Sequence, residues 1–268
     1  IGGGGFVNGL AAASSGGELV LYARTDVGGA YRYSPRTSTW HQLLLAGALD
    51  DSELGPDDYT VAAISVSPTD PDVVAVAVGN DPRPEPGWQV SSPHGRVLWS
   101  TDGGATWRSS TQRWSISADH AHRPGSEQLA IDPTDSSRAL LGTLHEGLWW
   151  TDDSGATWHQ VPDDVVPFGP PAGSDDVQSG VTSVSYLPPP DAGGDPVAVV
   201  GITGDGVYAT TDPVPEGRWT RIVDIEARSV PSSASLDGDG LVLAINTPGR
   251  ADARLLRITP ARSGRLDV

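Results

Sequence analysis

Arg24 and Asp26 are the side chains of this sequence best placed to do chemistry. They lie in residues 18–33, which read as two strands joined by a tight turn at Gly28 and Gly29, where glycine supplies the backbone freedom that a turn needs. A carboxylate beside an arginine at a strand end can meet a ligand, and a positioned carboxylate can act as a general base. The alternative is that Asp26 only caps the turn through its side chain.

A short motif that occurs twice indicates the scaffold around these residues. One copy, STDGGATW, ends at Trp107, and the other, TDDSGATW, ends at Trp158. Both copies match the Asp-box pattern S/T-x-D-x-G-x-T-W. We expect Asp102 and Asp153 to accept hydrogen bonds from backbone N–H groups across each turn, while the two tryptophans pack between neighbouring sheets.

The strand pattern around the Asp boxes predicts a repeated four-stranded unit. The clearest unit has strand-like runs at residues 128–132, 139–143, 147–151 and 158–161. Degenerate Asp boxes, residues 34–40 and 210–219, mark two further units. Radially repeated four-stranded antiparallel sheets form a β-propeller. We therefore predict an all-β propeller, as a single domain over residues 1–268 or a fragment of a larger propeller, with about five blades visible. The predicted blades span approximately residues 6–46, 60–113, 125–162, 180–223 and 229–268.

The topology of such a blade sorts the loops between its two ends. The turn after the second strand, which carries Asp26, lies at the opposite end from the Asp boxes. Four long segments fall at the Asp26 end, and long loops on a rigid scaffold are where ligands usually bind. Exposed tryptophan rings stack on sugars while carboxylates and arginines take the hydroxyls. The alternative is that the tryptophans of these loops cover blade edges. The candidate binding residues are Arg24, Trp88, Trp114, Asp119, His120, His122, Arg123, His145, Glu146, Asp175, Asp176 and Asp205.

The sequence offers no convincing metal or cofactor site. His120 and His122 follow Asp119 but lack a third partner at a known ligand spacing, so we expect them to be solvated. Residues 237–240, DGDG, resemble half of a calcium loop without its closing glutamate, and a hairpin turn is the better interpretation. No Walker, dinucleotide or G-x-S-x-G motif is present, so we expect no cofactor and no metal.

Composition restricts the partners and the cellular location. The net charge is −17, and all 17 basic residues are arginine, so the surface should repel nucleic acid and anionic membranes. A neutral polysaccharide is compatible with this charge. There is no Cys, and no apolar run approaches membrane-spanning length. There is also no Met, so we expect the chain to begin inside a longer, secreted precursor whose signal has been removed.

Residues 1–7, IGGGGFV, followed by residues 22–32, YARTDVGGAYR, resemble the start of glycoside hydrolase family 74, the xyloglucan-cleaving enzymes. Weaker similarity continues through residues 127–130, 147–149 and 180–184, so the resemblance spans most of the chain at low identity. It implies a hydrolase that cleaves the β-1,4-glucan backbone of xyloglucan with inversion, in which Asp26 is the general base.

The chain departs from the family in two respects. Family members have a seven-bladed first domain, whereas five blades are predicted here. They also carry the general acid on a second propeller that closes the cleft, and nothing in this chain corresponds to that domain. The resemblance therefore implies a partner propeller in the same precursor. The alternative is a non-catalytic Asp-box propeller that binds a glycan or a protein on its loop face.

Overall fold

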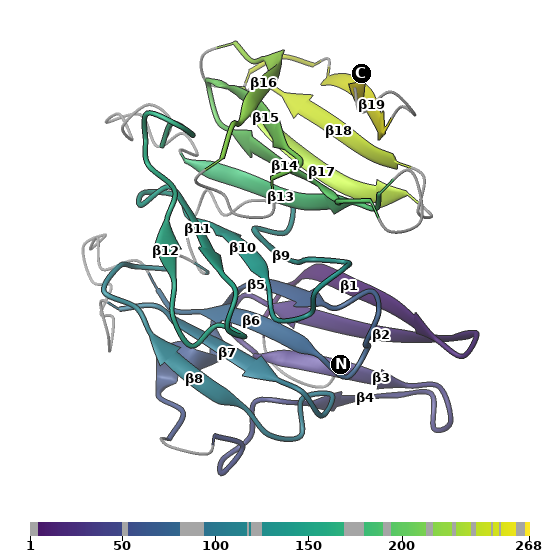
Figure 1. The fold of residues 1–268 in the computed structure, drawn as a ribbon. Coiled ribbons are helices and arrows are strands. Elements are labelled where there is room, and N and C mark those ends of the chain that lie inside the picture. Colours follow the sequence, from purple (N-terminus) through teal and green to yellow (C-terminus); the bar gives the residue numbers. More distant parts are fainter. Residues whose placement is uncertain are drawn as a thin grey trace. The chain divides into compact units, whose positions relative to one another are not determined.

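The computed structural model describes residues 5–49, 53–80, 94–116, 118, 125–168, 180–189, 194–212, 217–226, 229–236, 240–247, 249–251, 253–260 and 266–268. Its regular structure consists of five four-stranded antiparallel sheets, in which consecutive strands are neighbours (Figure 1). Apart from strands, this part of the chain contains a single 3-10 helix, η1 (Pro56–Tyr59). The predicted fold class, all-β with four-stranded antiparallel blades of the β-propeller type, is therefore confirmed.

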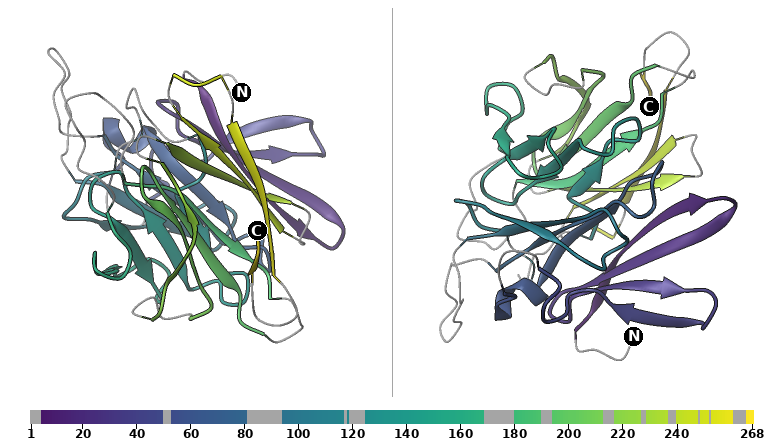
Figure 2. Two further views of the ribbon diagram at one scale, coloured as in Figure 1. Left: turned by 90° about the horizontal axis from the view of Figure 1, so that it is seen from above. Right: turned by 60° about the horizontal axis from the view of Figure 1, so that its bottom comes forward.

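We number the sheets as blades 1 to 5 in chain order, from the purple end to the yellow end of the colour scale in Figure 2. Blade 1 contains β1 (Val7–Ser15), β2 (Glu18–Thr25), β3 (Ala30–Ser34) and β4 (Thr39–Gln42). Blade 2 contains β5 (Val61–Val66), β6 (Val74–Val78), β7 (Arg96–Ser100) and β8 (Arg108–Thr111). Blade 3 contains β9 (Leu129–Ile131), β10 (Ala139–Gly142), β11 (Leu148–Thr151) and β12 (His159–Gln160). Blade 4 contains β13 (Val181–Leu187), β14 (Val197–Ile202), β15 (Gly206–Thr210) and β16 (Thr220–Asp224). Blade 5 contains β17 (Val230–Leu236), β18 (Gly240–Asn246), β19 (Ala253–Pro260) and β20 (Leu266–Asp267).

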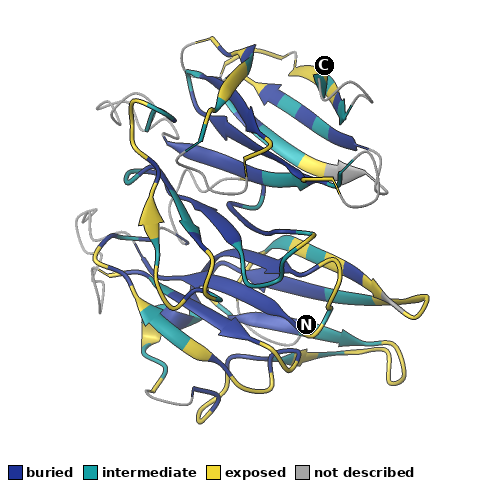
Figure 3. Cartoon of the chain, viewed as in Figure 1, coloured by how far each residue is buried: buried dark blue, intermediate teal, exposed yellow. Residues whose placement is uncertain are grey.

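Burial explains why these segments form strands. Every residue of β5 and of β6 is buried, and both strands consist mainly of valine and alanine, as expected where a sheet is covered on both faces. The fourth strands are polar and more exposed: both residues of β12 are exposed, and β8 is partly exposed (Figure 3). In blade 2, the apolar strands are thus the buried ones and the polar fourth strand is the partly exposed one.

The chain divides into two compact units. Unit 1 comprises Ile1–Arg123, Asp135–Ala139 and Thr151–Trp158, and unit 2 comprises Pro124–Thr134, Leu140–Trp150 and His159–Val268. In unit 1, apolar side chains of blades 1 and 2 form one core, which includes Tyr22, Ile64 and Trp107. In unit 2, two clusters of buried side chains cover the faces of β13 to β15.

The two complete Asp boxes form the same hydrogen-bond network. In blade 2, Asp102 Oδ1 accepts from the Thr106 N–H at 2.9 Å, and Asp102 Oδ2 accepts from Thr106 Oγ1 at 2.7 Å. In blade 3, Asp153 makes the corresponding bonds to Thr157 at 2.9 and 2.6 Å. The carboxylate thus accepts a backbone N–H inside its own turn, as the motif predicts.

The two Asp-box tryptophans differ in burial. Trp107 is 1% exposed and lies in the core of unit 1. Trp158 is only half-buried, and its Nε1 donates to Gly155 O at 3.2 Å, back into its own turn. In the degenerate copy of blade 4, the Asp212 N–H donates to Thr210 Oγ1 at 3.0 Å. The motif therefore predicts the turn better than it predicts the packing of its tryptophan.

Candidate active site

Asp26 lies in the turn that joins β2 to β3, and Thr25 closes this turn. Both the backbone N–H and Oγ1 of Thr25 donate to Gly29 O at 3.0 Å, and the Gly28 N–H donates to Thr25 Oγ1 at 2.8 Å. Gly29 has φ = +86°, a conformation that favours glycine. The sequence of this turn therefore fixes the direction in which residue 26 leaves the end of the strand.

The Asp26 carboxylate is held by the segment that precedes β1. Its Oδ1 accepts a hydrogen bond from the Phe6 N–H at 2.6 Å, and the Asp26 N–H donates to Phe6 O at 3.1 Å. Asp26 is 6% exposed, whereas Phe6 is 70% exposed. Asp26 is thus a largely covered carboxylate at the surface end of a strand, bonded on both its backbone and its side chain to one residue.

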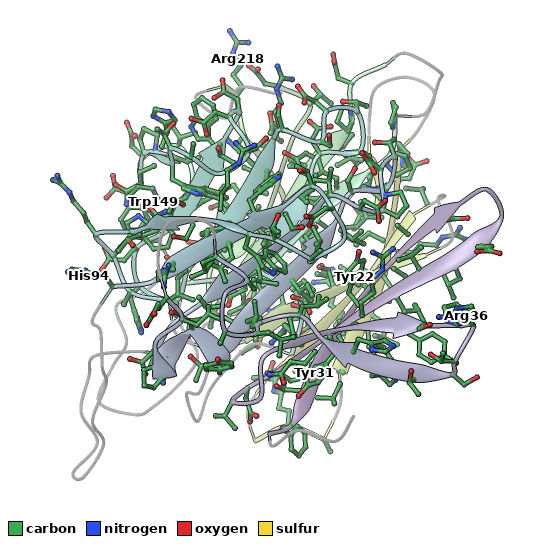
Figure 4. The ribbon with its side chains drawn as sticks, turned by 90° about the horizontal axis from the view of Figure 1, so that it is seen from below. Tyr22, Tyr31, Arg36, His94, Trp149 and Arg218 are labelled. Atoms are coloured by element: carbon green, nitrogen blue, oxygen red, sulfur yellow. The ribbon has the colours of Figure 1, made fainter. Side chains whose placement is uncertain are left out.

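A second set of contacts anchors the turn from the strands beside it. Tyr31 Oη donates to Gly28 O at 2.8 Å, and Gln42 Nε2 donates to the same carbonyl at 3.3 Å. The Gly29 N–H donates to Tyr59 O, at the end of η1, at 2.8 Å. Tyr31, labelled in Figure 4, is buried, and burial raises the pKa of its hydroxyl. This tyrosine therefore stays neutral and can donate its proton to the turn at physiological pH.

Arg24 lies beneath the turn rather than on the surface. Its side chain is 1% exposed, and Nη1 donates to Val61 O at the start of β5 at 3.3 Å. Arg24 lies within β2 and Asp26 follows the strand directly, so the two residues share one end of β2 but have different hydrogen-bond partners. The guanidinium, however, is placed to support the interior of unit 1, and its predicted contact with substrate is not shown by this geometry.

An ion pair lies in the neighbouring segment of unit 1. Arg96 Nη1 is 2.6 Å from Asp58 Oδ2, and both side chains are largely buried. The Gly55 N–H donates to the same Asp58 oxygen at 2.7 Å. This ion pair fixes the segment before β5. Because Tyr59 O of that segment accepts the hydrogen bond from Gly29 in the Asp26 turn, the ion pair supports the site indirectly.

The corresponding turn of blade 3, in unit 2, is built in the same way. Thr143 Oγ1 donates to Gly147 O at 2.9 Å, and the Glu146 N–H donates to Thr143 Oγ1 at 2.9 Å. Trp149 Nε1 and Gln160 Nε2 both donate to Glu146 O, at 2.9 and 2.8 Å. These roles match those of Thr25, Tyr31 and Gln42 in blade 1. The residue that follows Thr143 is leucine, so this turn holds no carboxylate where blade 1 holds Asp26.

Asp205, in the turn before β15 of unit 2, is bonded to neighbouring side chains. Its Oδ1 accepts from Tyr208 Oη at 2.6 Å and lies 3.8 Å from Arg221 Nη2. Burial and this hydrogen bond to Asp205 raise the pKa of Tyr208 to about 12. Asp205 is therefore already used by its own blade, which limits what it can offer to a ligand.

Several predicted site residues lie outside the described residues: Trp88, Asp119, His120, His122, Arg123, Asp175 and Asp176. Trp114 is described and is 6% exposed, so its ring is not available as a sugar platform in this structure. The alternative interpretation of this tryptophan, that it covers a blade edge, agrees with its burial. Within the described part of the chain, no group of three or more His, Cys, Asp or Glu side chains could hold a metal ion.

Sequence reasoning missed Thr25, Tyr31 and Gln42 as supports of the candidate base. A signal was present, because Thr-x-x-x-Gly followed two residues later by an aromatic residue occurs at both Thr25 and Thr143. It also missed Phe6, whose contribution comes from its backbone N–H and so has no side-chain signature. No helix in the described ranges has the length and hydropathy to cross a membrane.

Comparisons with known proteins support the resemblance to family 74. No family model matches the chain. A xyloglucanase from Paenibacillus sp is 32% identical over 252 residues, which are 89% of this chain and 23% of that protein. The xyloglucanase Xgh74A of Acetivibrio thermocellus is 38% identical over 164 residues, 60% of this chain and 18% of that protein. The solved GH74 xyloglucanase from Xanthomonas campestris superposes with a TM-score of 0.76 at 28% identity, covering 100% of this chain and 38% of that chain.

These matches confirm the predicted resemblance, both in sequence and in fold. They also show that the chain spans about a fifth of the length of the curated relatives that it matches.

Proposed function

We propose that this chain, a homologue of the glycoside hydrolase family 74 xyloglucanases, is the part of a xyloglucan-cleaving hydrolase that carries the general base. The observation that carries the proposal is the placement of Asp26. It stands at the end of β2 in blade 1, in the segment with the strongest resemblance to the family, and the Phe6 N–H orients its carboxylate at 2.6 Å. A carboxylate held in this way is suited to proton transfer.

In the proposed reaction, Asp26 takes a proton from a water molecule as the water oxygen attacks the anomeric carbon. A carbon–oxygen bond forms on one face of the sugar while the glycosidic bond breaks on the other, and a second carboxylic acid protonates the departing oxygen. Inversion leaves room for the water when the two carboxyl groups are about 6.5–9.5 Å apart. The product of a β-linked substrate is then the α-anomer.

The general acid is proposed to come from a further domain of the same protein. Asp205 already accepts a hydrogen bond from Tyr208 and lies 3.8 Å from Arg221, so we do not propose it as the acid. Relatives of much greater length are consistent with such a domain.

We assign supporting roles to the other candidates. Arg24 is proposed to stabilise the charged turn from within the blade, since its guanidinium is buried. Sugar binding by Trp88, Asp119, Arg123 and Asp205 stays a proposal based on their loops, and Trp114 is proposed to pack rather than to stack on sugar. We also propose secretion, because a polymer such as xyloglucan does not cross a cell membrane intact.

The test is to incubate the protein expressed from its complete reading frame with xyloglucan and to follow the products by proton NMR. We expect oligosaccharides whose new reducing ends first appear as the α-anomer. Absence of any product, in a protein shown to be folded by circular dichroism, would remove the hydrolase proposal. Initial formation of the β-anomer would contradict the inverting mechanism.

One observation favours the second candidate function, a propeller that binds glycan without cleaving it. The Phe6 N–H already uses Asp26 Oδ1, as a purely structural cap would. In that case the protein would bind xyloglucan with no turnover, and Asp26→Asn would leave the affinity unchanged. Calorimetric titration with xyloglucan oligosaccharides, alongside the product assay, distinguishes the two functions.

A further inference from the structure

We infer that Gly5 and Phe6, the two residues before β1, act together as a positioning device for the Asp26 carboxylate. The inference rests on the proposed function of Asp26 as the general base, and it adds residues to which that proposal gives no role. Phe6 supplies the hydrogen-bond donor through its backbone, and Gly5 leaves the space that the carboxylate occupies.

The bond between Phe6 and Asp26 is reciprocal. The Phe6 N–H donates to Asp26 Oδ1 at 2.6 Å, and the Asp26 N–H donates to Phe6 O at 3.1 Å. The register of β1 against β2 shifts between Val7 and Gly9, so the chain leaves the regular ladder just after this pair. The extra residue there lets the segment before β1 reach over the end of β2. Because the donor is a backbone N–H, whose position does not depend on a side-chain rotamer, it holds Asp26 Oδ1 in one place.

Gly5 is packed against the same oxygen atom. Its φ is +94°, and a Cβ placed there would lie 2.8 Å from Asp26 Oδ1, 3.1 Å from Gly28 N and 3.1 Å from Val27 Cγ2. The contact with the carboxylate oxygen is the shortest of the three and is closer than a real Cβ approaches another atom, so this contact has to give way first. Any side chain at position 5 would therefore displace the carboxylate before it displaced the turn.

Displacement of this kind matters more for catalysis than for stability. A general base has to lie within hydrogen-bond reach of the water that it deprotonates. A misplacement of about 1 Å can cost roughly 100-fold in rate, and a designed constellation has to be held within about 0.5 Å. Gly5 and Phe6 hold the side chain of Asp26, while Thr25 and Tyr31 hold its turn.

The chain offers a matched control for the glycine. Gly17, in the turn between β1 and β2, has φ = +86°, and a Cβ placed there would meet nothing within 4 Å. Gly5→Ala and Gly17→Ala therefore both place a side chain at positive φ, but only Gly5→Ala places an atom against the Asp26 carboxylate. The two variants separate the loss of the base's position from the loss of stability.

The experiment measures kcat and KM for xyloglucan hydrolysis by the complete protein, together with the melting temperature. We expect Gly5→Ala to lower kcat by about 10- to 100-fold with KM changed less than about twofold. Gly17→Ala should lower the melting temperature by a similar amount and keep kcat. Equal kcat values for the two variants would overturn the inference.

A second pair of variants tests the donor if Gly5→Ala does not fold. Phe6→Pro and Phe6→Ala both remove the ring, but only Phe6→Pro removes the N–H. We expect kcat of Phe6→Pro to be at least about tenfold below that of Phe6→Ala. Equal kcat values would overturn the inference, and so would failure of both Gly5→Ala and Phe6→Pro to fold while Gly17→Ala folds, because the segment would then serve the fold.

Asp26→Ala separates this inference from the proposed function. Turnover that survives Asp26→Ala, or a wild-type protein without turnover, would refute Asp26 as the base, and the positioning role would fail with it. Turnover that is lost in Asp26→Ala but retained in Gly5→Ala would refute the positioning role alone.

Discussion

The same residue type does different work at the two ends of a blade. Both carboxylate oxygens of Asp102 accept hydrogen bonds inside its own Asp-box turn, from Ser100 and Thr106. Asp26 instead accepts a hydrogen bond from Phe6, which lies twenty positions earlier in the chain, just before β1. A carboxylate whose bonds are all local serves its turn, whereas one held by a distant segment can be oriented toward a ligand.

The local bonds of Asp102 make stability depend on pH. Burial alone would raise the pKa of Asp102, but hydrogen bonds from Thr106 and Ser100 outweigh it and lower the pKa below its ordinary value of 3.8. The stabilisation is therefore fully present above the unfolded pKa and is lost as the pH falls through the folded one. We expect the melting temperature of Asp102→Asn to fall below that of the wild type at pH 6 and to approach it near pH 2. A constant difference across this range would show that the carboxylate charge contributes nothing.

Residue roles were predicted well where they are local and poorly where they depend on distant contacts. The Asp-box bonds of Asp102 and Asp153 follow from the motif, because donor and acceptor are four residues apart. The bond from Phe6 to Asp26 depends on the register of β1 against β2, and the burial of Trp114 depends on its surroundings in the fold. No local pattern encodes either feature.

At the scale of elements, the sequence predicted the strands of blade 3 to within two residues. The predicted run 139–143 corresponds to β10 (Ala139–Gly142), and 147–151 corresponds to β11 (Leu148–Thr151). Apolar strands bounded by glycine and Asp-box signals are well marked in a sequence. The 3-10 helix η1 was not predicted, because it is a single turn that the long segment before β5 forms as it packs beside the Asp26 turn.

The two Asp-box turns provide a test of backbone strain. Ser154 has φ = +60°, and the equivalent residue of blade 2 is Gly103, with φ = +72°. The left-handed conformation costs a non-glycine residue about 1–2 kcal/mol. Glycine avoids this cost but loses more conformational entropy on folding, which offsets roughly 0.5–1 kcal/mol of the gain. We expect Ser154→Gly to stabilise the protein by about 0.5–1 kcal/mol in chemical denaturation.

The reverse substitution serves as its control. Gly103→Ser should destabilise by more than Ser154→Gly stabilises, because a Cβ at Gly103 would collide with the Arg32 guanidinium, which pairs with Asp72 at 3.0 Å. A destabilised Ser154→Gly protein would indicate that the Ser154 side chain contributes more than its backbone strain costs.

At the scale of the whole molecule, the sequence predicts each of the five blades found in the described residues, including blade 5, which has no Asp box. The repeats make this prediction possible, because the strand order found in the clearest unit can be applied to the less clear ones. The chain spans 23% of the length of the Paenibacillus xyloglucanase. Under our account, a complete active site requires more than these 268 residues.

The isolated chain provides the test of that requirement. We expect residues 1–268, purified alone, to fold and to release no oligosaccharides from xyloglucan, because our proposal assigns the general acid to a further domain. Reducing-sugar assays over a day of incubation, with the complete protein as positive control, measure this. Hydrolysis by the isolated chain at the rate of the complete protein would refute the two-domain account.

The most direct test of the central claim compares two aspartates at opposite ends of their blades in the complete protein. Asp26→Ala should lower kcat on xyloglucan by roughly 10²–10⁴-fold, since general base catalysis contributes about this much. Its melting temperature should also fall by a few degrees, because the hydrogen bond from the Phe6 N–H is lost. Asp102→Ala should lower the melting temperature by roughly 2–4 °C, for a loss of about 1 kcal/mol, and leave kcat nearly unchanged. The account predicts that kcat is lost in Asp26→Ala and kept in Asp102→Ala, and an Asp26→Ala protein that retains wild-type kcat would contradict it.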